Sequence, residues 1–222
     1  MAIAYNASSD GGGLTASPKT WSHACTGSDL ILWVATQTTG TVSGVTYNGV
    51  AMTLLATHND ASSYNIALYY LLNPATGSNN IVVTTTGATV NGAGASYTGC
   101  LGGIDAWADY TGSSGQSNPV TASLTTIANN CWTIIAFNGV TASTPSASTG
   151  TTQRVLVAGG TLFGDSNAPI VAAGSTSMSV TFSDFPVSGR YGYAIIASFS
   201  PTAGGGGGGA TGRKLSLLGA GL

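Results

Sequence analysis

Two aspartates beside two aromatic residues form the segment of this sequence that could carry chemistry. Asp105 and Asp109 stand four residues apart in GIDAWADYTG, next to Trp107 and Tyr110. Hydrolysis of a glycosidic bond needs two carboxyl groups that face each other across a sugar, one usually with a raised pKa. Two solvated aspartates in a surface loop give the same pattern, and we favour that interpretation. The aromatic pair could instead stack on a sugar ring, although packing in a core or a subunit interface is the stronger expectation.

The two histidines give no clear catalytic pattern. His23 is expected within a strand, and His58 is expected in the polar loop THNDASS. The abundance of Ser and Asp means that composition alone does not exclude a Ser-His-Asp arrangement, but the G-x-S-x-G motif of a nucleophile elbow is missing. We therefore predict that the protein is not an enzyme, and we assign no catalytic residue.

Candidate ligands for metals and cofactors are also weak. Cys25, Cys100 and Cys131 lie in expected strands without a CxxC or Cys/His spacing, so buried free thiols are expected rather than a zinc site. The segments 58–60 and 165–167 offer oxygen ligands for calcium, but Asn and Asp in turns explain them better. The sequence predicts no metal and no cofactor.

Strand signals dominate the elements that must position these residues. Short runs of β-branched and aromatic residues alternate with Gly, Asn, Ser and Pro, giving about eleven candidate strands and almost no helical periodicity. LILWVAT is a continuous apolar run, as expected for a strand that is covered on both faces. Asn48-Gly49 favours a type I′ hairpin turn. We predict an all-β antiparallel β-sandwich, with a jelly roll as the preferred topology.

The domain organisation follows from the same strands. No fixed-period repeat is visible, which argues against a solenoid or a propeller. We prefer one sandwich domain over residues 1–201 to a split at the loop of residues 111–120, because the strands on both sides look alike and would share one core. A Gly-rich linker at 202–212 and a basic, apolar peptide at 213–222 follow.

Charge is scarce along the whole chain. Only 5% of the residues are charged, against about a quarter in ordinary soluble proteins, and Glu is missing altogether. A surface of hydroxyls and amides has little charge to keep copies apart, and it lacks the clustered cations that nucleic acid requires. The first residues, MAIAYNASSDGGG, do not form a secretory signal, and no window is long and apolar enough for a membrane span. We expect synthesis in a host cytoplasm.

The final segment has the composition of a tethered anchor. Six consecutive glycines can reach about 20 Å when extended. A basic pair and four leucines follow them: Arg213, Lys214, Leu215, Leu217, Leu218 and Leu222. One interpretation is a docking peptide that adds to a groove or sheet edge of a neighbouring subunit, and the other is an unselected terminus. Four leucines exposed to solvent would favour non-specific association, so we prefer docking.

Several segments resemble known β-sandwich proteins. TWSHACTGSDLILWVA, VSGVTYNGVAMTLL and LYYLLNPATGSNNIVVT, which together span roughly residues 20–85, and the later GASYTGCLGGIDAW are similar to jelly-roll or concanavalin-like sandwiches. Such sandwiches occur in bacteriophage virion proteins of the decoration, fibre or tail type and in environmental surface proteins. GRKLSLLGAGL resembles short endings of phage structural proteins. The resemblance implies a fold and brings no catalytic residues with it.

Together these features predict a non-enzymatic structural protein of a phage virion. It would decorate the capsid, form a head fibre or associate with the tail, and its partners would be copies of itself or other virion subunits held by the C-terminal peptide. The alternative is a carbohydrate-binding surface or fibre module that uses Trp107 and Tyr110 to contact host glycans.

Overall fold

A computed structural model describes residues 1–59, 64–86, 89–111, 118–139, 144–158, 160–182 and 192–201. Within these ranges the chain forms strands and no helix, and every pair of neighbouring strands is antiparallel. The prediction of an all-β antiparallel sandwich is confirmed.

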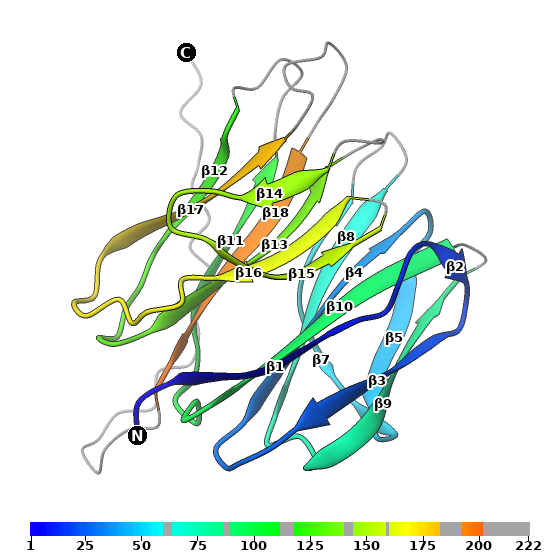
Figure 1. The fold of residues 1–222 in the computed structure, drawn as a ribbon, viewed down its shortest axis with the longest axis horizontal. Coiled ribbons are helices and arrows are strands. Elements are labelled where there is room, and N and C mark those ends of the chain that lie inside the picture. The colour runs from blue at the N-terminus through cyan, green and yellow to red at the C-terminus, as the bar shows by residue number, and fades with distance from the viewer. Residues whose placement is uncertain are drawn as a thin grey trace.

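The N-terminal half contains two sheets, which we name A and B (Figure 1). Sheet A has the order β1 (Ala4–Asp10), β10 (Thr89–Thr98), β4 (Ile31–Thr38), β8 (Asn65–Leu72), β7 (Thr53–Asn59), with the short β2 (Thr15–Ala16) also paired to β10. Sheet B has the order β3 (Lys19–Cys25), β9 (Gly77–Thr85), β5 (Val42–Tyr47), β6 (Val50–Ala51).

The C-terminal half contains two further sheets, C and D. Sheet C has the order β11 (Gly103–Thr111), β18 (Gly192–Ser200), β13 (Trp132–Gly139), β16 (Thr161–Asp165), β15 (Thr152–Val157). Sheet D has the order β12 (Val120–Thr125), β17 (Ser175–Phe182), β14 (Pro145–Ala147).

The two halves repeat one topology. The order β1-β10-β4-β8-β7 of sheet A returns in sheet C as β11-β18-β13-β16-β15, and β3-β9-β5 of sheet B returns in sheet D as β12-β17-β14. Bulges recur at matching places, in β1 and β11 and again in β7 and β15. The first pair of bulges makes Asn6 the counterpart of Asp105. The chain is therefore a twofold structural repeat, which the sequence did not reveal.

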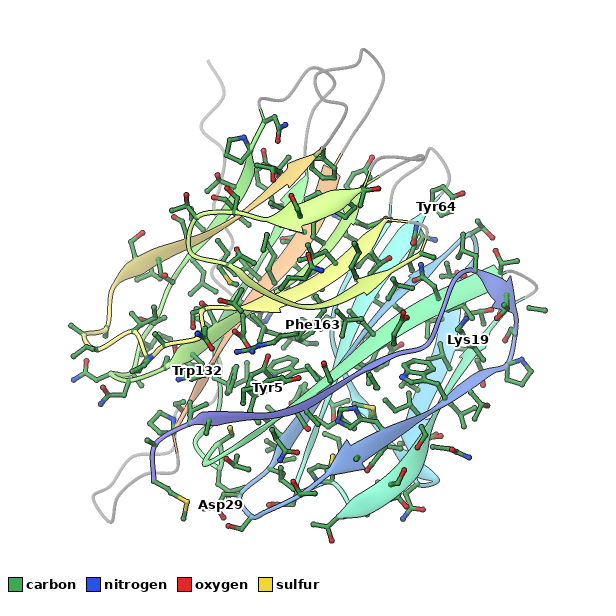
Figure 2. All side chains as sticks on the ribbon, viewed as in Figure 1. Tyr5, Lys19, Asp29, Tyr64, Trp132 and Phe163 are labelled. Carbon is green, nitrogen blue, oxygen red and sulfur yellow. The ribbon has the colours of Figure 1, made fainter. Side chains whose placement is uncertain are left out.

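The four sheets stack in the order B, A, C, D. One buried cluster lies between A and C and draws residues from both halves, among them Trp33, Tyr97 and Phe163. A second cluster lies between B and A, and a third lies between C and D. Because A and C are covered on both faces, all eight residues of β4 and of β13 are buried, which explains the continuous apolar runs of these strands. Figure 2 shows Tyr5, Trp132 and Phe163 where the two halves meet.

Two local predictions are confirmed. Asn48 and Gly49 have φ values of 49° and 76°, so both turn positions are left-handed, as a type I′ turn requires. Cys25, Cys100 and Cys131 are buried free thiols, and burial raises the pKa of Cys100 and of Cys131 to about 12.

Candidate functional site

The two candidate carboxylates lie in a strand, so their interpretation as a solvated surface loop is wrong. Asp105 is the bulge residue of β11 and is only 3% exposed. Its oxygens accept hydrogen bonds from the backbone N–H groups of Ile127 (2.9 Å) and Ala128 (2.8 Å) and from Ser198 Oγ (2.8 Å). Asp109 is exposed, with Oδ2 4.0 Å from Nδ1 of His58. Asp105 thus fixes the connection between β12 and β13, and the two acids occupy unlike environments.

The N-terminal half has the same arrangement, which we call the bulge latch, with the amide of Asn6 in place of the carboxylate of Asp105. Asn6 Oδ1 accepts from the backbone N–H of Thr26 (3.1 Å) and from Ser96 Oγ (3.0 Å). Ser96 and Ser198 occupy matching places beside the bulge. Thr26 and Ile127 follow the matching strands β3 and β12 and donate the equivalent backbone hydrogen bond. A polar residue at this bulge therefore ties an edge strand to the turn below it in both repeats, which is a structural role.

Trp107 and Tyr110 lie on opposite faces of β11. Residues three apart in a strand point to opposite sides of the sheet. Trp107 packs against the cluster between sheets A and C, whereas Tyr110 packs against the cluster between C and D. The two rings therefore do not form one platform for a sugar.

His23 lies inside a hydrogen-bonded chain. Trp21 Nε1 donates to Ser9 Oγ (3.1 Å), which is 2.8 Å from His23 Nδ1, while His23 Nε2 is 3.0 Å from Ser96 Oγ. Because Ser96 donates its hydroxyl hydrogen to Asn6, it accepts from Nε2–H, and Ser9 donates to Nδ1. Burial lowers the pKa of His23 to about 4, which agrees with this neutral tautomer.

His58 lies in strand β7 and not in the expected loop. Its ring stacks on Tyr193 of β18, with the ring centroids 4.7 Å apart. Strands β7 and β18 belong to different halves, so this stacking joins sheets A and C.

The segment Asp165–Asn167 is built around an ion pair. Asp165 is fully buried and accepts from Arg154 Nε (2.6 Å) and Nη2 (3.0 Å), and from Tyr97 Oη (2.8 Å). Arg154 also lies 3.9 Å above the Tyr5 ring. The carboxylate considered for calcium is thus occupied by a cation of the protein. The part of the chain that the structure describes contains no cluster of three or more His, Cys, Asp or Glu residues suited to a metal.

A pocket of about 390 Å³ lies between β11 and β12. We call it the β11–β12 pocket. Residues of β11, β12, β17 and β18 line it: Ala106, Trp107, Ala108, Asp109, Tyr110, Thr121, Ser123, Leu124, Thr125, Ser175 and Ile196. Trp107, Asp109 and Tyr110 are candidate residues from the sequence, but the pocket itself was not predictable, because no residue pattern in β12 marks that strand as the opposite wall.

The corresponding space in the N-terminal half is filled. Trp21 and His23 stand where Ala122 and Leu124 stand in the C-terminal half. Trp21 packs on Gly92 so closely that a Cβ there would lie 2.5 Å from the indole ring. On the C-terminal side the smaller Ala122 stands at the position of Trp21, and Tyr110 is one of the residues that line the pocket.

The predicted docking residues fall outside the described residues. They are Arg213, Lys214, Leu215, Leu217, Leu218 and Leu222. The described part of the chain contains no helix that is long and apolar enough to cross a membrane.

Comparisons with known proteins add no relative. No protein-family model, curated protein or solved structure matches the chain. The resemblance noted in the sequence is therefore supported at the level of an all-β sandwich alone.

Proposed function

We propose that the protein is a non-enzymatic structural component of a bacteriophage virion, in a decoration, head-fibre or tail position. It works by packing against neighbouring subunits, and the peptide of residues 213–222 acts as its anchor. The affiliation with jelly-roll phage proteins is part of this proposal.

The observation that carries the proposal is that few of the described charged side chains are exposed on the surface. Lys19 is 6% exposed and donates to Gly13 O and Thr15 Oγ1. Arg154 and Asp165 pair with each other, and Asp105 is buried in its latch. Among the described charged residues, Asp10 and Asp109 are the ones classed as exposed. Such a surface offers little electrostatic repulsion to a second copy.

The outer faces of sheets B and D carry rows of hydroxyl groups instead. Cross-strand pairs of these hydroxyls hydrogen-bond, as in Ser22 with Ser78 (2.7 Å) and Ser123 with Ser177 (2.8 Å). Thr20 and Thr121 extend the rows at matching positions of the two repeats. Because these groups already satisfy one another in part, the faces can be buried against a neighbour at a lower desolvation cost than charged faces.

The test is the composition of purified particles of the phage that encodes this chain. Quantitative mass spectrometry should find the protein in fixed stoichiometry to the major capsid or tail protein, and immunogold labelling should place it on the particle. Its absence from washed particles, with the protein present in the infected cell, would refute the proposal.

The alternative function is a carbohydrate-binding module. The β11–β12 pocket favours it, because Trp107, Tyr110, Asp109 and several hydroxyls contribute to one lining. The placement of the two rings on opposite strand faces weakens it. A glycan array with the wild type and Trp107→Ala separates the two functions. If the wild type binds a glycan and the variant does not, the carbohydrate-binding function is supported. If the wild type binds no glycan, the carbohydrate-binding function is ruled out.

A further inference from the structure

Three Asn-Gly pairs occur in this chain, at residues 48–49, 91–92 and 138–139. An asparagine that precedes glycine can lose its side-chain amide when the next backbone nitrogen attacks the side-chain carbonyl carbon. Glycine favours this step, because it has no Cβ to shield its backbone nitrogen. The three pairs are equivalent in sequence, so the structure decides which of them can react.

Asn48 and Gly49 form the turn between β5 and β6. Both residues are exposed, and both have the left-handed φ values of a type I′ turn. The N–H of Asn48 donates to Asn80 O (3.0 Å), which holds the start of the turn to β9. Among the hydrogen bonds of the described residues, none uses the C=O of Asn48 or the N–H of Gly49. The peptide group between the two residues can therefore rotate without breaking a bond of its own.

That rotation is required for the attack. In the left-handed conformation the following nitrogen lies on the far side of the Cα–C bond from Cβ, so the side chain cannot reach it. A Cβ built on Gly49 would meet no atom within 4 Å, which shows that the turn has room to move. Strand β6 is only two residues long, so motion at this hairpin tip disturbs few contacts.

We propose that Asn48 is a site of spontaneous deamidation in the folded protein, whereas the fold protects Asn91 and Asn138. The backbone nitrogen of Gly49 gives its proton to a base in solution and attacks Cγ of Asn48. A C–N bond forms, the bond from Cγ to the amide nitrogen breaks, and ammonia leaves. Water then opens the cyclic imide at either of its C–N bonds, which gives aspartate or isoaspartate.

Asn91 is protected within β10, an inner strand of sheet A. It is fully buried, its Nδ2 donates to Gln37 Oε1 (2.7 Å), and its Oδ1 accepts from Thr161 Oγ1 (3.3 Å). Gly92 lies against Trp21, where a Cβ would be 2.5 Å from the indole ring. The amide cannot meet the attacking nitrogen unless sheet A opens.

Asn138 gives the sharper comparison, because its buried amide has no hydrogen-bond partner among the described residues. Its protection comes from the glycine that follows it. The N–H of Gly139 donates to Gly160 O (3.1 Å), and a Cβ at Gly139 would lie 2.6 Å from the Phe182 ring. The attacking nitrogen is thus already bonded, in a crowded part of the inner strand β13.

The reaction would place a charge where the described surface has none. A hollow beside the turn, on the outer face of sheet B, is lined among the described residues by uncharged side chains, including Asn48, Ser78 and Asn80. Each conversion adds one negative charge to a chain whose formal net charge is −2. Isoaspartate also carries the main chain through the side-chain carbon, which alters the turn. The product is an acidic form of the protein that accumulates with time.

The experiment incubates the purified full-length protein in mildly alkaline heavy-oxygen water, followed by digestion at low pH and peptide mapping by mass spectrometry. Heavy oxygen marks the deamidation that occurs during incubation and not during handling. Asn48 should react at least about a hundredfold faster than Asn91 or Asn138, because inner strands open far more rarely than a hairpin tip. Native isoelectric focusing should show an acidic band that grows at the same rate.

Two kinds of control separate the fold from the sequence. In concentrated urea the unfolded chain should react at all three pairs at similar rates, since glycine follows each asparagine. Gly49→Ala should slow the reaction at Asn48 about tenfold, because a methyl group then shields the attacking nitrogen. Asn48→Asp keeps a sequence suited to the turn and should migrate with the acidic band from the start.

Three outcomes would overturn the inference. They are similar rates at the three pairs in the folded protein, a faster reaction at Asn91 or Asn138 than at Asn48, and no heavy oxygen at residue 48 after long incubation of the folded protein. The inference does not depend on the proposed function. Absence of the protein from particles would refute that function and would leave the deamidation result unchanged.

Discussion

Removing the Asp105 carboxylate should destabilise the fold far more than removing the exposed carboxylate of Asp109 on the same strand. Asp105→Ala leaves two backbone N–H groups and Ser198 without their acceptor in a site that is 3% exposed. A hydrogen bond to a charged group is worth about 1.5–3 kcal/mol. The variant also no longer has to desolvate a carboxylate, which offsets part of this loss. We therefore expect the free energy of unfolding to fall by about 4 kcal/mol.

The other repeat supplies the comparison. Asp105→Asn recreates the amide of Asn6, whose Oδ1 accepts two equivalent bonds, and should cost about 1–2 kcal/mol because the third donor loses its acceptor. Asn6→Ala breaks bonds at a half-buried site and should cost about 1 kcal/mol. Asp109→Asn, on the same strand but exposed, should change stability by less than about 0.5 kcal/mol.

The assay is urea unfolding at 25 °C and neutral pH, followed by far-ultraviolet circular dichroism and analysed by linear extrapolation. The order of losses should be Asp105→Ala, then Asp105→Asn, then Asn6→Ala, with unchanged m-values. A loss below about 1 kcal/mol for Asp105→Ala, or an equal loss for Asn6→Ala, would refute the assignment of Asp105 as a buried latch.

Three further predictions concern buried polar groups. Burial lowers the pKa of His23 to about 4, so its contribution to stability is complete above pH 6.5 and is lost as the pH falls towards 4. The loss of unfolding free energy from this group has an upper limit of about 3 kcal/mol. If the wild type loses no more stability than His23→Gln between pH 7 and pH 4.5, this account is wrong. Asp165→Leu should cost about 3–5 kcal/mol by stranding Arg154, and adding Arg154→Leu should recover part of that loss in the same urea assay. Asn138→Leu should raise the thermal midpoint, because the buried amide of Asn138 has no hydrogen-bond partner among the residues that the structure describes. A lower midpoint would oppose that account.

The strands were predictable because their signals are local. Ile31–Thr38 is continuously apolar at its start and is buried between two sheets, and Asn48-Gly49 forms the expected turn. The strand at Gly103–Thr111 was missed, because its two aspartates suggested a loop, and no local signal shows that a bulge turns Asp105 towards buried N–H groups. Partners of that kind come from tertiary structure, in this case from Ser198, which is far away in sequence.

The repeat was hidden for a related reason. Matching positions keep a role but not a residue type: Trp21 corresponds to Ala122, and His23 corresponds to Leu124. Ser96 and Ser198 are identical, but they stand among different neighbours, and the spacing between matched residues drifts along the chain. The two repeats are similar in their strand topology and in the positions of their bulges. Neither feature can be read from the periodicity of apolar residues in the sequence.

One difference between the two repeats lies between the edge strands of each sandwich. The bulge latch, the buried inner sheets and the hydroxyl rows occur in both halves. The space between the edge strands does not: it holds a hydrogen-bonded Trp21 and His23 in one half and a pocket in the other. The two repeats therefore share one framework and differ in the side chains that fill the space between their edge strands.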